Sequence, residues 1–537
     1  MTPPWRASAV LRPLCSLLAL VAAGAAAQDW GGGLGLGYGG DGGSLHSSGG
    51  GGGGAGASGG GRGFYVVPTF SANATLTDNV KLSATDKQSD LLLVAQPGIQ
   101  IGGQSGRVRG FLDYSLMASL SARGNTSNSF RSLLNASGNA EVVPNRLFVD
   151  ANASISQQSL SPFGTQSTDP SLDNDNSTQV TTVNVAPYTQ GQIAGQVNYL
   201  GRAFYTHTDS GSSQASNSTV FGWLLGFDST TRWSQLSWGL DFSYREARFT
   251  DRRNEFDQLN VLSLTYAVTP ELHATVRGNV ETSNLTTVED ETNTGWGGGV
   301  TWRPSPRTRF IAEYDQRVFG NSHLYSFNYR TPRTVWIISD RQSLSTGQDG
   351  LGRGNAGSVF DMLFEQFASI EPDPVARAQL VNDFMRANGI DPTLSLNNGY
   401  LPGQVTLQRR QDASVSWLGL RSTVIFNVYQ TEAEGLQPSL LNPDDPLAAG
   451  NAIRWRGLAG NWMHRLTPRD SLTVRVSGQR TNESYGTRET TIWTGLAMWS
   501  MQLAERTSAS LSARYTTQSG SSSYDEAALL ATLNMTF

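Results

Sequence analysis

The sequence predicts an all-β fold, a large antiparallel transmembrane β-barrel of about 22 strands with a range of about 18–24. Three observations predict it. Apolar and polar residues alternate along many segments. Many of these segments reach roughly a dozen residues, which suits a tilted strand that crosses a bilayer better than a globular strand. The connections between segments alternate between short and long, as in bacterial outer-membrane barrels. A secreted β-sandwich or solenoid also alternates and is the competing fold.

The amino terminus, residues 1–27, has the organisation of a secretory signal peptide. Arg6 and Arg12 precede the apolar run Leu14–Ala23, and three alanines follow as a small-residue cleavage site. A membrane anchor is the alternative, but the apolar run is too short to span a bilayer. The only cysteine, Cys15, lies inside this segment, so the exported chain is expected to use no disulfide.

Residues 28–63 are dominated by glycine and predict a flexible tether. His46 stands alone in this tract and is interpreted as an exposed histidine rather than a metal ligand. The barrel itself is expected over residues 64–537.

Alternation is clearest in segments such as "SLTVRVSGQ", where Leu472, Val474 and Val476 share one face and polar residues share the other. Aromatic residues gather near the predicted strand ends, which favours interfacial girdles, although a sandwich core also holds aromatics. The tryptophans in question are Trp223, Trp233, Trp302, Trp336, Trp417, Trp462, Trp493 and Trp499.

The chain ends "AALLATLNMTF", in which Leu533, Met535 and Phe537 form one apolar face between polar residues. A closed barrel must pair its last strand with its first, and both then face lipid. This terminus resembles the carboxy-terminal signal that the barrel-assembly machinery reads in outer-membrane proteins.

If the apolar faces meet lipid, the opposite faces line the lumen. These positions carry charges that either pair across neighbouring strands and stiffen the wall or form a polar track for a hydrophilic solute. The predicted lumen-facing residues are Arg109, Asp113, Arg277, Arg309, Glu313, Asp315, Arg333 and Arg475. A barrel of this size is too wide for its own side chains to fill.

A helical hairpin is predicted in the long connection over residues 347–403. Ser358 and Asp361 suit a capping box, and Asp373-Pro374 suits the start of a second helix. The apolar faces of the two helices are Phe360, Leu363, Phe364, Phe367, Leu380, Val381 and Phe384. The hairpin is interpreted as a lid or plug at the barrel mouth, and an external decoration is the alternative.

Composition and motifs exclude several function classes. The formal net charge of −5 argues against a nucleic-acid partner. The histidines show no catalytic or metal-ligating spacing, so we expect neither an enzyme nor a cofactor.

Several ordered stretches resemble a known family. They are "ATLTDNV", "VAQPGIQI", "NRLFVDANASISQQSLSPFG", "AEYDQRVFGNSHLYSFNYRTPRTVWIISD" and "DPVARAQLVNDFMRANG". The chain is similar over residues 64–537 to outer-membrane proteins associated with the PEP-CTERM/exosortase system, which occur with exopolysaccharide gene clusters in Gram-negative bacteria. The resemblance implies an outer-membrane barrel with a role in exopolysaccharide or envelope export, and it assigns no functional residue.

Sequence and resemblance together predict a channel or accessory component for exopolysaccharide export in the outer membrane of a Gram-negative bacterium. A structural or adhesive surface protein and a general diffusion porin are the alternatives. The expected partners are outer-membrane lipid, the barrel-assembly machinery during biogenesis, and polysaccharide with periplasmic export components.

Overall fold

The computed structural model describes residues 63–172, 174–212, 216–230, 235–250, 253–345, 404–436, 447, 451–484 and 486–537. Over these residues the chain forms a 22-stranded sheet, and no helix occurs in them. The predicted fold class and strand number are therefore confirmed. The helical hairpin predicted over residues 347–403 lies outside the described residues, as do the predicted signal peptide and most of the glycine-rich tract.

The strands follow one another along the chain with bounds that match the alternating segments. They are β1 (Gly63–Thr77), β2 (Asp90–Ser105), β3 (Val108–Ser121), β4 (Ser129–Val143), β5 (Leu147–Ser159), β6 (Ser177–Ile193), β7 (Val197–Ser210), β8 (Ser218–Thr230), β9 (Leu236–Phe249), β10 (Glu255–Thr269), β11 (Leu272–Ser283), β12 (Glu291–Ser305), β13 (Thr308–Arg317), β14 (Gly320–Arg330), β15 (Thr334–Ser345), β16 (Thr406–Leu418), β17 (Ser422–Gly435), β18 (Ala452–Arg465), β19 (Asp470–Glu483), β20 (Glu489–Ala504), β21 (Thr507–Gly520) and β22 (Tyr524–Thr536).

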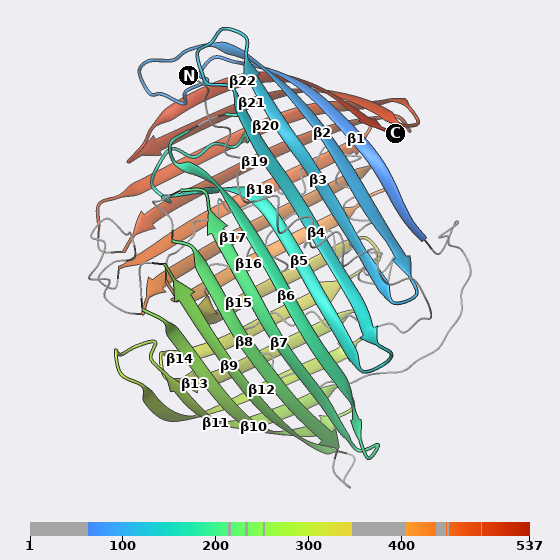
Figure 1. Ribbon diagram of the computed structural model, residues 1–537, viewed down its shortest axis with the longest axis vertical. Coiled ribbons are helices and arrows are strands. Elements are labelled where there is room, and N and C mark those ends of the chain that lie inside the picture. The colour runs from blue at the N-terminus through green and yellow to red at the C-terminus, as the bar shows by residue number, and fades with distance from the viewer. Residues whose placement is uncertain are drawn as a thin grey trace, which may run out of the picture.

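The sheet closes on itself because the last strand pairs with the first (Figure 1). β1 and β22 run antiparallel, from Thr69 opposite Thr536 to Thr77 opposite Ala528. Every other strand pairs antiparallel with its neighbours in the chain, as β1 does with β2 and β21 with β22. Closure leaves no strand edge with unpaired backbone groups, which is the condition for a sheet surrounded by lipid.

The two ends of the barrel differ in their connections. At one end, here called the turn end, strands join through tight turns such as 106–107 and 270–271, and β1 begins and β22 ends there. Ala194 and Gly195 in the β6–β7 turn adopt positive φ angles of 52° and 68°, which reverse the chain within a few residues. At the other end, the loop end, connections such as 78–89 and 160–176 are longer. The two-residue β13–β14 connection is a short exception.

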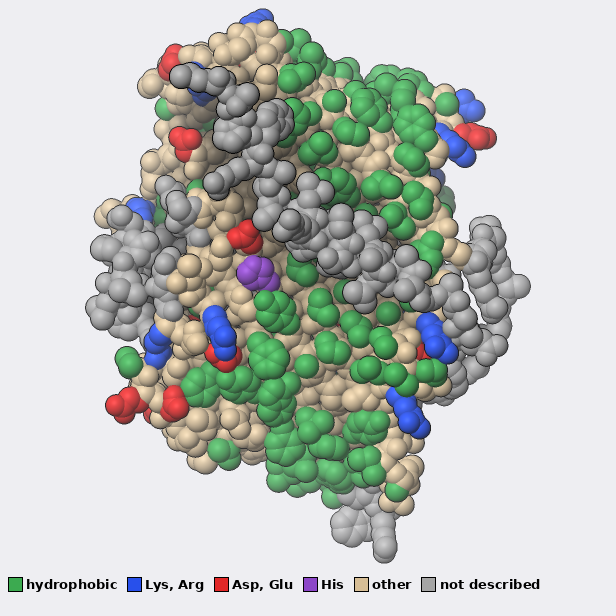
Figure 2. Space-filling view, in the orientation of Figure 1, with side chains coloured by type: hydrophobic (Ala, Val, Ile, Leu, Met, Phe, Trp, Pro, Cys, Tyr) green, Lys and Arg blue, Asp and Glu red, His purple; other side chains and the backbone are tan. Residues whose placement is uncertain are grey.

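The two faces of the sheet differ in polarity. On β10, Leu262, Leu264 and Tyr266 point outward and are 52%, 43% and 49% exposed. Asp257 on the other face is buried and lines the lumen with the polar residues that pair beside it. Figure 2 shows hydrophobic side chains spread over the viewed wall, with most charged side chains toward its margins. This polarity is inverted relative to a soluble protein and is typical of a barrel that spans a membrane.

Exposed aromatic side chains form two belts on the outward face. Those nearer the turn end are Tyr266, Trp302, Tyr329, Trp336, Trp417, Trp462 and Trp499, and those nearer the loop end are Tyr205, Trp223, Trp296, Trp493 and Tyr515. Amphipathic rings favour the two membrane–water interfaces, so the belts mark the limits of the spanning region. Trp233 lies outside the described residues.

The last strand follows the predicted pattern. Leu529 and Phe537 are 55% and 62% exposed on the outward face, and Leu533 and Met535 lie between them on the same face. The backbone N–H of Phe537 donates to the Pro68 carbonyl at 3.0 Å, which joins the chain end to β1. Recognition of these three residues by an assembly machinery stays a prediction.

Among the described residues, no helix has the length and apolar character needed to cross a membrane.

Candidate functional site

The most distinctive feature of the lumen is the β5–β6 loop, residues 160–176, which folds inward from the loop end. It joins β5 to β6 but contacts β20, β21 and β22 on the far side of the β1–β22 seam. The Asp169 carboxylate accepts a hydrogen bond at 2.7 Å from Nη1 of Arg514 on β21. Nη2 of Arg514 donates to the Glu526 carboxylate on β22 at 2.8 Å. All three side chains are buried, at 5%, 7% and 1% exposure.

The loop reaches well below the rim of the barrel. Arg514 lies six residues before Gly520, the last residue of β21, so the Asp169 carboxylate sits about 15 Å inside the loop end for a strand of ordinary rise and tilt. The loop therefore narrows the lumen rather than covering it from outside.

Nearer the loop end than this ion pair, a series of hydrogen bonds joins the loop to β21, β22 and the turn between them. The Gln518 side chain accepts from the Gln166 N–H at 3.0 Å and donates to the Gly164 carbonyl at 3.1 Å. The Tyr524 hydroxyl donates to the Gln166 carbonyl, and the Thr165 and Ser522 hydroxyls lie 2.7 Å apart. The loop follows β21 and β22 over several residues, so it is held along its length rather than at one point.

Local interactions give the loop its shape before it meets the wall. The Asn176 amide donates to the carbonyls of Ser161 and Thr165 at 2.9 and 3.1 Å and so ties the two ends of the loop together. A Cβ on Gly164 would come within 2.4 Å of the Asn176 side chain, so this close approach needs glycine. Asp169 also accepts from the Ser171 N–H and hydroxyl at 2.8 and 2.7 Å, an Asx turn.

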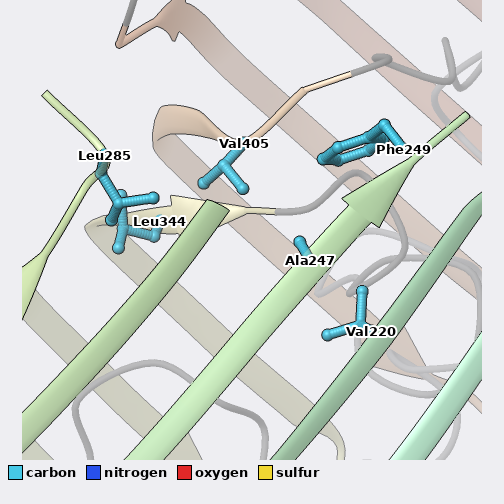
Figure 3. Close-up of a cluster of buried hydrophobic side chains, with 6 residues drawn as sticks. All are labelled: Val220, Ala247, Phe249, Leu285, Leu344 and Val405. Carbon is cyan, nitrogen blue, oxygen red and sulfur yellow. The ribbon is translucent and has the colours of Figure 1, made fainter. Parts of the chain in front are cut away.

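Three apolar clusters pack at the loop end of the barrel, and two of them include residues of the β5–β6 loop. The first contains Val80, Leu82, Leu92, Leu172 and Tyr524, and the second contains Phe163, Leu447 and Ile453 with Trp455 against it. The third, drawn in Figure 3, contains Val220, Ala247, Phe249, Leu285, Leu344 and Val405. The residues come from strands and loops far apart in sequence, so the clusters bind separate parts of the loop end together.

Val405, just before β16, shows how far these contacts reach. Its N–H donates to the Glu255 carboxylate on β10 at 3.0 Å, although β10 and β16 are not neighbours in the sheet. The chain that enters β16 is thus fixed on the lumen side of another part of the wall.

Charged side chains on β10–β13 form a second lumen feature. Arg277 on β11 donates to Asp315 on β13 through Nε and Nη2 at 2.8 and 2.9 Å, and its Nη1 lies 3.5 Å from Glu313. The guanidinium passes over β12 at Gly297, where a Cβ would lie 1.9 Å from the Asp315 carboxylate. Glycine at this position leaves room for an ion pair between side chains of β11 and β13, which are not neighbours in the sheet.

A similar set of ion pairs lies nearer the loop end on the same strands. Arg317 on β13 reaches over β12 to Glu281 on β11, with distances of 2.7 and 3.0 Å, and to Asp257 on β10 at 3.2 Å. Paired charges of this kind stiffen the wall, as one of the two sequence interpretations expected.

The predicted lumen residues fall in different places. Arg109 and Asp113 lie on β3, Arg277 on β11, Arg309, Glu313 and Asp315 on β13, and Arg475 on β19, all on rows that the register assigns to the lumen. Arg333 lies in the turn between β14 and β15. From this set, the structure pairs Arg277 with Asp315 and places it beside Glu313. The predicted lid residues Phe360, Leu363, Phe364, Phe367, Leu380, Val381 and Phe384 lie outside the described residues.

Charged residues of these two features that the predicted set does not contain include Asp169, Asp257, Glu281, Arg317 and Glu526. The alternation of β11 and β22 places Glu281 and Glu526 on the polar face, so the pattern contains a signal for them. Nothing near Asp169 in sequence indicates its partner Arg514, which lies 345 residues away.

The ion pair with Arg514 affects the protonation state of the Asp169 carboxyl in the loop. Burial acts to raise the pKa of the Asp169 carboxyl, but the Arg514 guanidinium and the hydrogen bonds from Ser171 outweigh it and hold the pKa below its usual range. Asp169 is therefore charged at neutral pH and remains paired. Among the described residues, no group of three or more histidine, cysteine or acidic side chains is arranged to hold a metal ion.

No protein-family model and no curated protein matches this chain. Solved structures of similar shape include the FrpB iron transporter from Neisseria meningitidis (F3-3 variant), with 10% identity, a TM-score of 0.48, and coverage of 88% of this chain and 81% of that one. The siderophore receptor PirA from Acinetobacter baumannii is similar with 9% identity, a TM-score of 0.46, and coverage of 88% and 80%. A mutant of the ferric enterobactin receptor from Pseudomonas aeruginosa has 8% identity, a TM-score of 0.45, and coverage of 89% and 82%.

Proposed function

We propose that this chain is a channel in the outer membrane of a Gram-negative bacterium and that it passes a hydrophilic polymer, of the exopolysaccharide class that the family resemblance implies. The loop end then faces outside and the turn end faces the periplasm. The observation that carries the proposal is the β5–β6 loop, which is docked by buried polar contacts inside a polar lumen. A loop held this way sets the width of a pore, whereas a purely external loop does not.

The lumen wall suits a sugar chain. Its rows present amides, hydroxyls and charges, such as Asn135, Asn152 and Asn184 on β4–β6, and these groups exchange hydrogen bonds with hydroxyl-rich solutes. A barrel of 22 strands is wider than its own side chains can fill. Its conductance is then set by what folds into it.

The turn end favours an acidic polymer. Most of the described turns carry an arginine, and the turn arginines are Arg107, Arg146, Arg307, Arg333, Arg421, Arg469 and Arg506. Glu271 and Glu505 are the turn carboxylates among the same described residues. A cationic rim raises the local concentration of an anionic chain at the periplasmic entrance.

A sealed structural or adhesive barrel is the second candidate, and the apolar clusters at the loop end favour it. Clusters of buried aliphatic and aromatic residues exclude water, and water is what carries ions through a pore. A general diffusion porin differs from both candidates, because it predicts a constant open conductance in the unaltered chain.

The test is the conductance of the refolded protein in a planar bilayer, with residues 163–172 replaced by two glycines. β5 and β6 are adjacent, so a short linker joins them without strain. A matched control removes residues 287–290, which form the exposed tip of the β11–β12 loop.

The proposal expects a small current from the unaltered chain and the control, and a severalfold larger current from the β5–β6 variant. Acidic oligosaccharide added at the turn end should block that current more strongly than a neutral one of equal length. Absence of current from all three forms contradicts the channel and supports the structural barrel. Equal large currents contradict the constriction and support a general porin.

A further inference from the structure

The outward face of β14–β20 departs from the rest of the wall. On β15, the apolar residues Trp336 and Ile338 are followed toward the loop end by Asp340, and on β16 Ala413 is followed by Gln411 and Arg409. Cross-strand pairing places polar residues of the neighbouring strands side by side at this height. One row therefore runs across β15–β19, consisting of Asp340, Gln411, Gln430, Arg456 and Arg480.

A second row lies one step nearer the loop end. It consists of Arg409, Glu432, Arg454, Asn482 and Glu489 on β16–β20. The two rows together are called the charged belt below. On β10 the outward residues at the same distances from the loop end are Gln258 and Asn260, which are polar but uncharged, so the charges of the belt set β15–β20 apart from this strand.

The belt is an ordered network with exposed cations. Asp340 accepts from Nη2 of Arg409 at 2.7 Å and from the Gln411 amide at 2.9 Å. Arg454 forms a bidentate pair with Glu432 at 2.9 and 3.3 Å. The side chains of Arg409 and Arg480 remain 46% and 58% exposed.

Arg456 differs from the other arginines of the belt. Its Nε donates to the neutral Gln430 amide at 2.8 Å, whereas Arg409, Arg454 and Arg480 donate to carboxylates. Arg456 is also exposed and lies in the row nearer the apolar wall. A positive charge held by an amide retains its attraction for an external anion.

A hollow of about 480 Å³ lies on the turn-end side of this network. Its outward apolar lining is contributed by Phe310, Tyr325, Phe327, Ile338, Ala413 and Val428, and Asp340, Gln411 and Gln430 form its polar margin. Ala413 faces Ile338 and Val428 on the adjacent strands, and its small side chain leaves the wall indented between larger neighbours. The hollow and the first row of the belt therefore share a boundary.

We propose that this surface binds a phosphorylated glycolipid of the outer leaflet, of the lipid A type. One acyl chain lies in the hollow, and phosphate contacts Arg456 and Arg409. The inference rests on the membrane location in the proposed function, because the outward face of these strands then lies against lipid. An acyl chain matches the apolar lining, and a phosphate matches the guanidinium geometry at its margin.

The extent of the belt favours a glycolipid over a two-chain phospholipid. Adjacent strands lie about 4.8 Å apart, so a row across five strands extends for roughly 20 Å, more than one phosphate group occupies. The interspersed carboxylates Asp340, Glu432 and Glu489 suit divalent cations that bridge carboxylate and phosphate oxygens. A headgroup with several phosphates and bound divalent cations matches this alternation.

The experiment titrates diphosphorylated lipid A into the full chain purified in detergent with Mg²⁺ present, and follows bound lipid by native mass spectrometry. R456Q should weaken half-saturation about tenfold, since a charge-assisted hydrogen bond to phosphate is lost. A413W fills the hollow without changing charge and should weaken binding comparably. R248Q is the matched control, because Arg248 on β9 is outward, 62% exposed and paired with Glu246 at 2.8 Å.

Several results overturn the proposal. They are equal affinity for lipid A without phosphates, equal affinity for phosphatidylglycerol, and equal weakening by R248Q. Heat-modifiable migration on gels confirms that each variant is folded. Lipid binding is measured independently of conductance. A barrel that conducts no ions but binds lipid A would therefore contradict the proposed channel function and leave the lipid site intact. A conducting barrel that ignores lipid A contradicts this inference alone.

Discussion

The loop-end half and the turn-end half of the lumen are built from the same strands but are packed differently. On β22, Tyr524 and Glu526 near the loop end are 4% and 1% exposed, whereas Asn534 near the turn end is exposed on the same lumen row. On β6, Thr178 and Val180 are buried, while Gln192 is exposed. Alternation is equal in both halves. On β22 the residues near the loop end are covered by the β5–β6 loop, whereas on β16 and β17 lumen residues of the turn-end half, such as Ser416 and Ile425, are buried as well.

This contrast shows that a strand pattern specifies the face of a residue but not its burial. On β22 a lumen residue is buried where the β5–β6 loop covers it, as at Tyr524, and exposed where that loop does not reach, as at Asn534. Substitutions of lumen residues should therefore be costly where the β5–β6 loop covers them and mild at the exposed lumen positions of the turn-end half.

The largest expected effect is that of R514A. Removal of the guanidinium leaves the Asp169 and Glu526 carboxylates buried without their common partner, and loss of one member of a buried ion pair costs about 3–5 kcal/mol. The free energy of unfolding in urea, measured in lipid vesicles, checks this value. R309A is the comparison, because Arg309 is exposed on the lumen face near the turn end, and a change within about 0.5 kcal/mol is expected there. Equal costs would remove the distinction between the halves.

F163A should cost about 3 kcal/mol, since Phe163 is 4% exposed and packs with Leu447 and Ile453. Phe111 occupies a half-buried lumen position in the turn-end half of β3 and provides the comparison. F111A should cost clearly less in the same urea titration. A larger loss for F111A would show that the turn-end half is packed as tightly as the other.

Acidification should loosen the loop-end half first. The pKa of Asp169 is lowered in the folded protein, so the unfolded chain takes up the proton before the folded one as pH falls. The stabilisation from this group is therefore complete above the unfolded pKa of about 3.9 and is lost as pH falls through the folded value. D169N should show a smaller loss of unfolding free energy between neutral and acid pH than the unaltered chain. Identical pH profiles would refute a role for Asp169.

The smallest effect is expected for Y524F. The hydroxyl of Tyr524 donates to the Gln166 carbonyl, and the loss of one such bond costs about 1 kcal/mol while the ring stays packed against Leu172. Urea titration of Y524F beside Y515F gives the comparison, since Tyr515 is outward and 53% exposed. A loss of stability in Y515F but not in Y524F would contradict the assignment of Tyr524 to the packed lumen face and of Tyr515 to the outward face.

Much of the fold is predictable because strand geometry is local. Leu472, Val474 and Val476 alternate with polar residues in sequence and lie on one face of β19 in the structure. The terminal run through Leu533 and Met535 likewise lies in β22, which pairs with β1 as far as Thr536. The period of two needs no knowledge of the rest of the chain.

The site is less predictable because its contacts are non-local. Arg277 and Asp315 are 38 residues apart in sequence. They lie on β11 and β13, and consecutive strands are neighbours in the sheet, so their proximity follows from the strand order. Asp169 instead meets Arg514 across 345 residues, and no local pattern encodes that distance. The predicted polar face includes Arg333, but this residue lies in the turn between β14 and β15, where the strand alternation has ended.

The most direct measurement is a disulfide cross-link between the β5–β6 loop and the wall. The hydroxyl oxygens of Thr165 and Ser522 lie 2.7 Å apart, which is compatible with a disulfide after substitution. T165C/S522C, produced without residues 1–27 and hence without Cys15, should oxidise to a cross-linked form that migrates differently on gels until it is reduced. T165C/S510C, with the second cysteine near the turn end of β21, should not cross-link. Cross-linking of the second pair, or failure of the first in a folded barrel, would contradict the inward position of the loop.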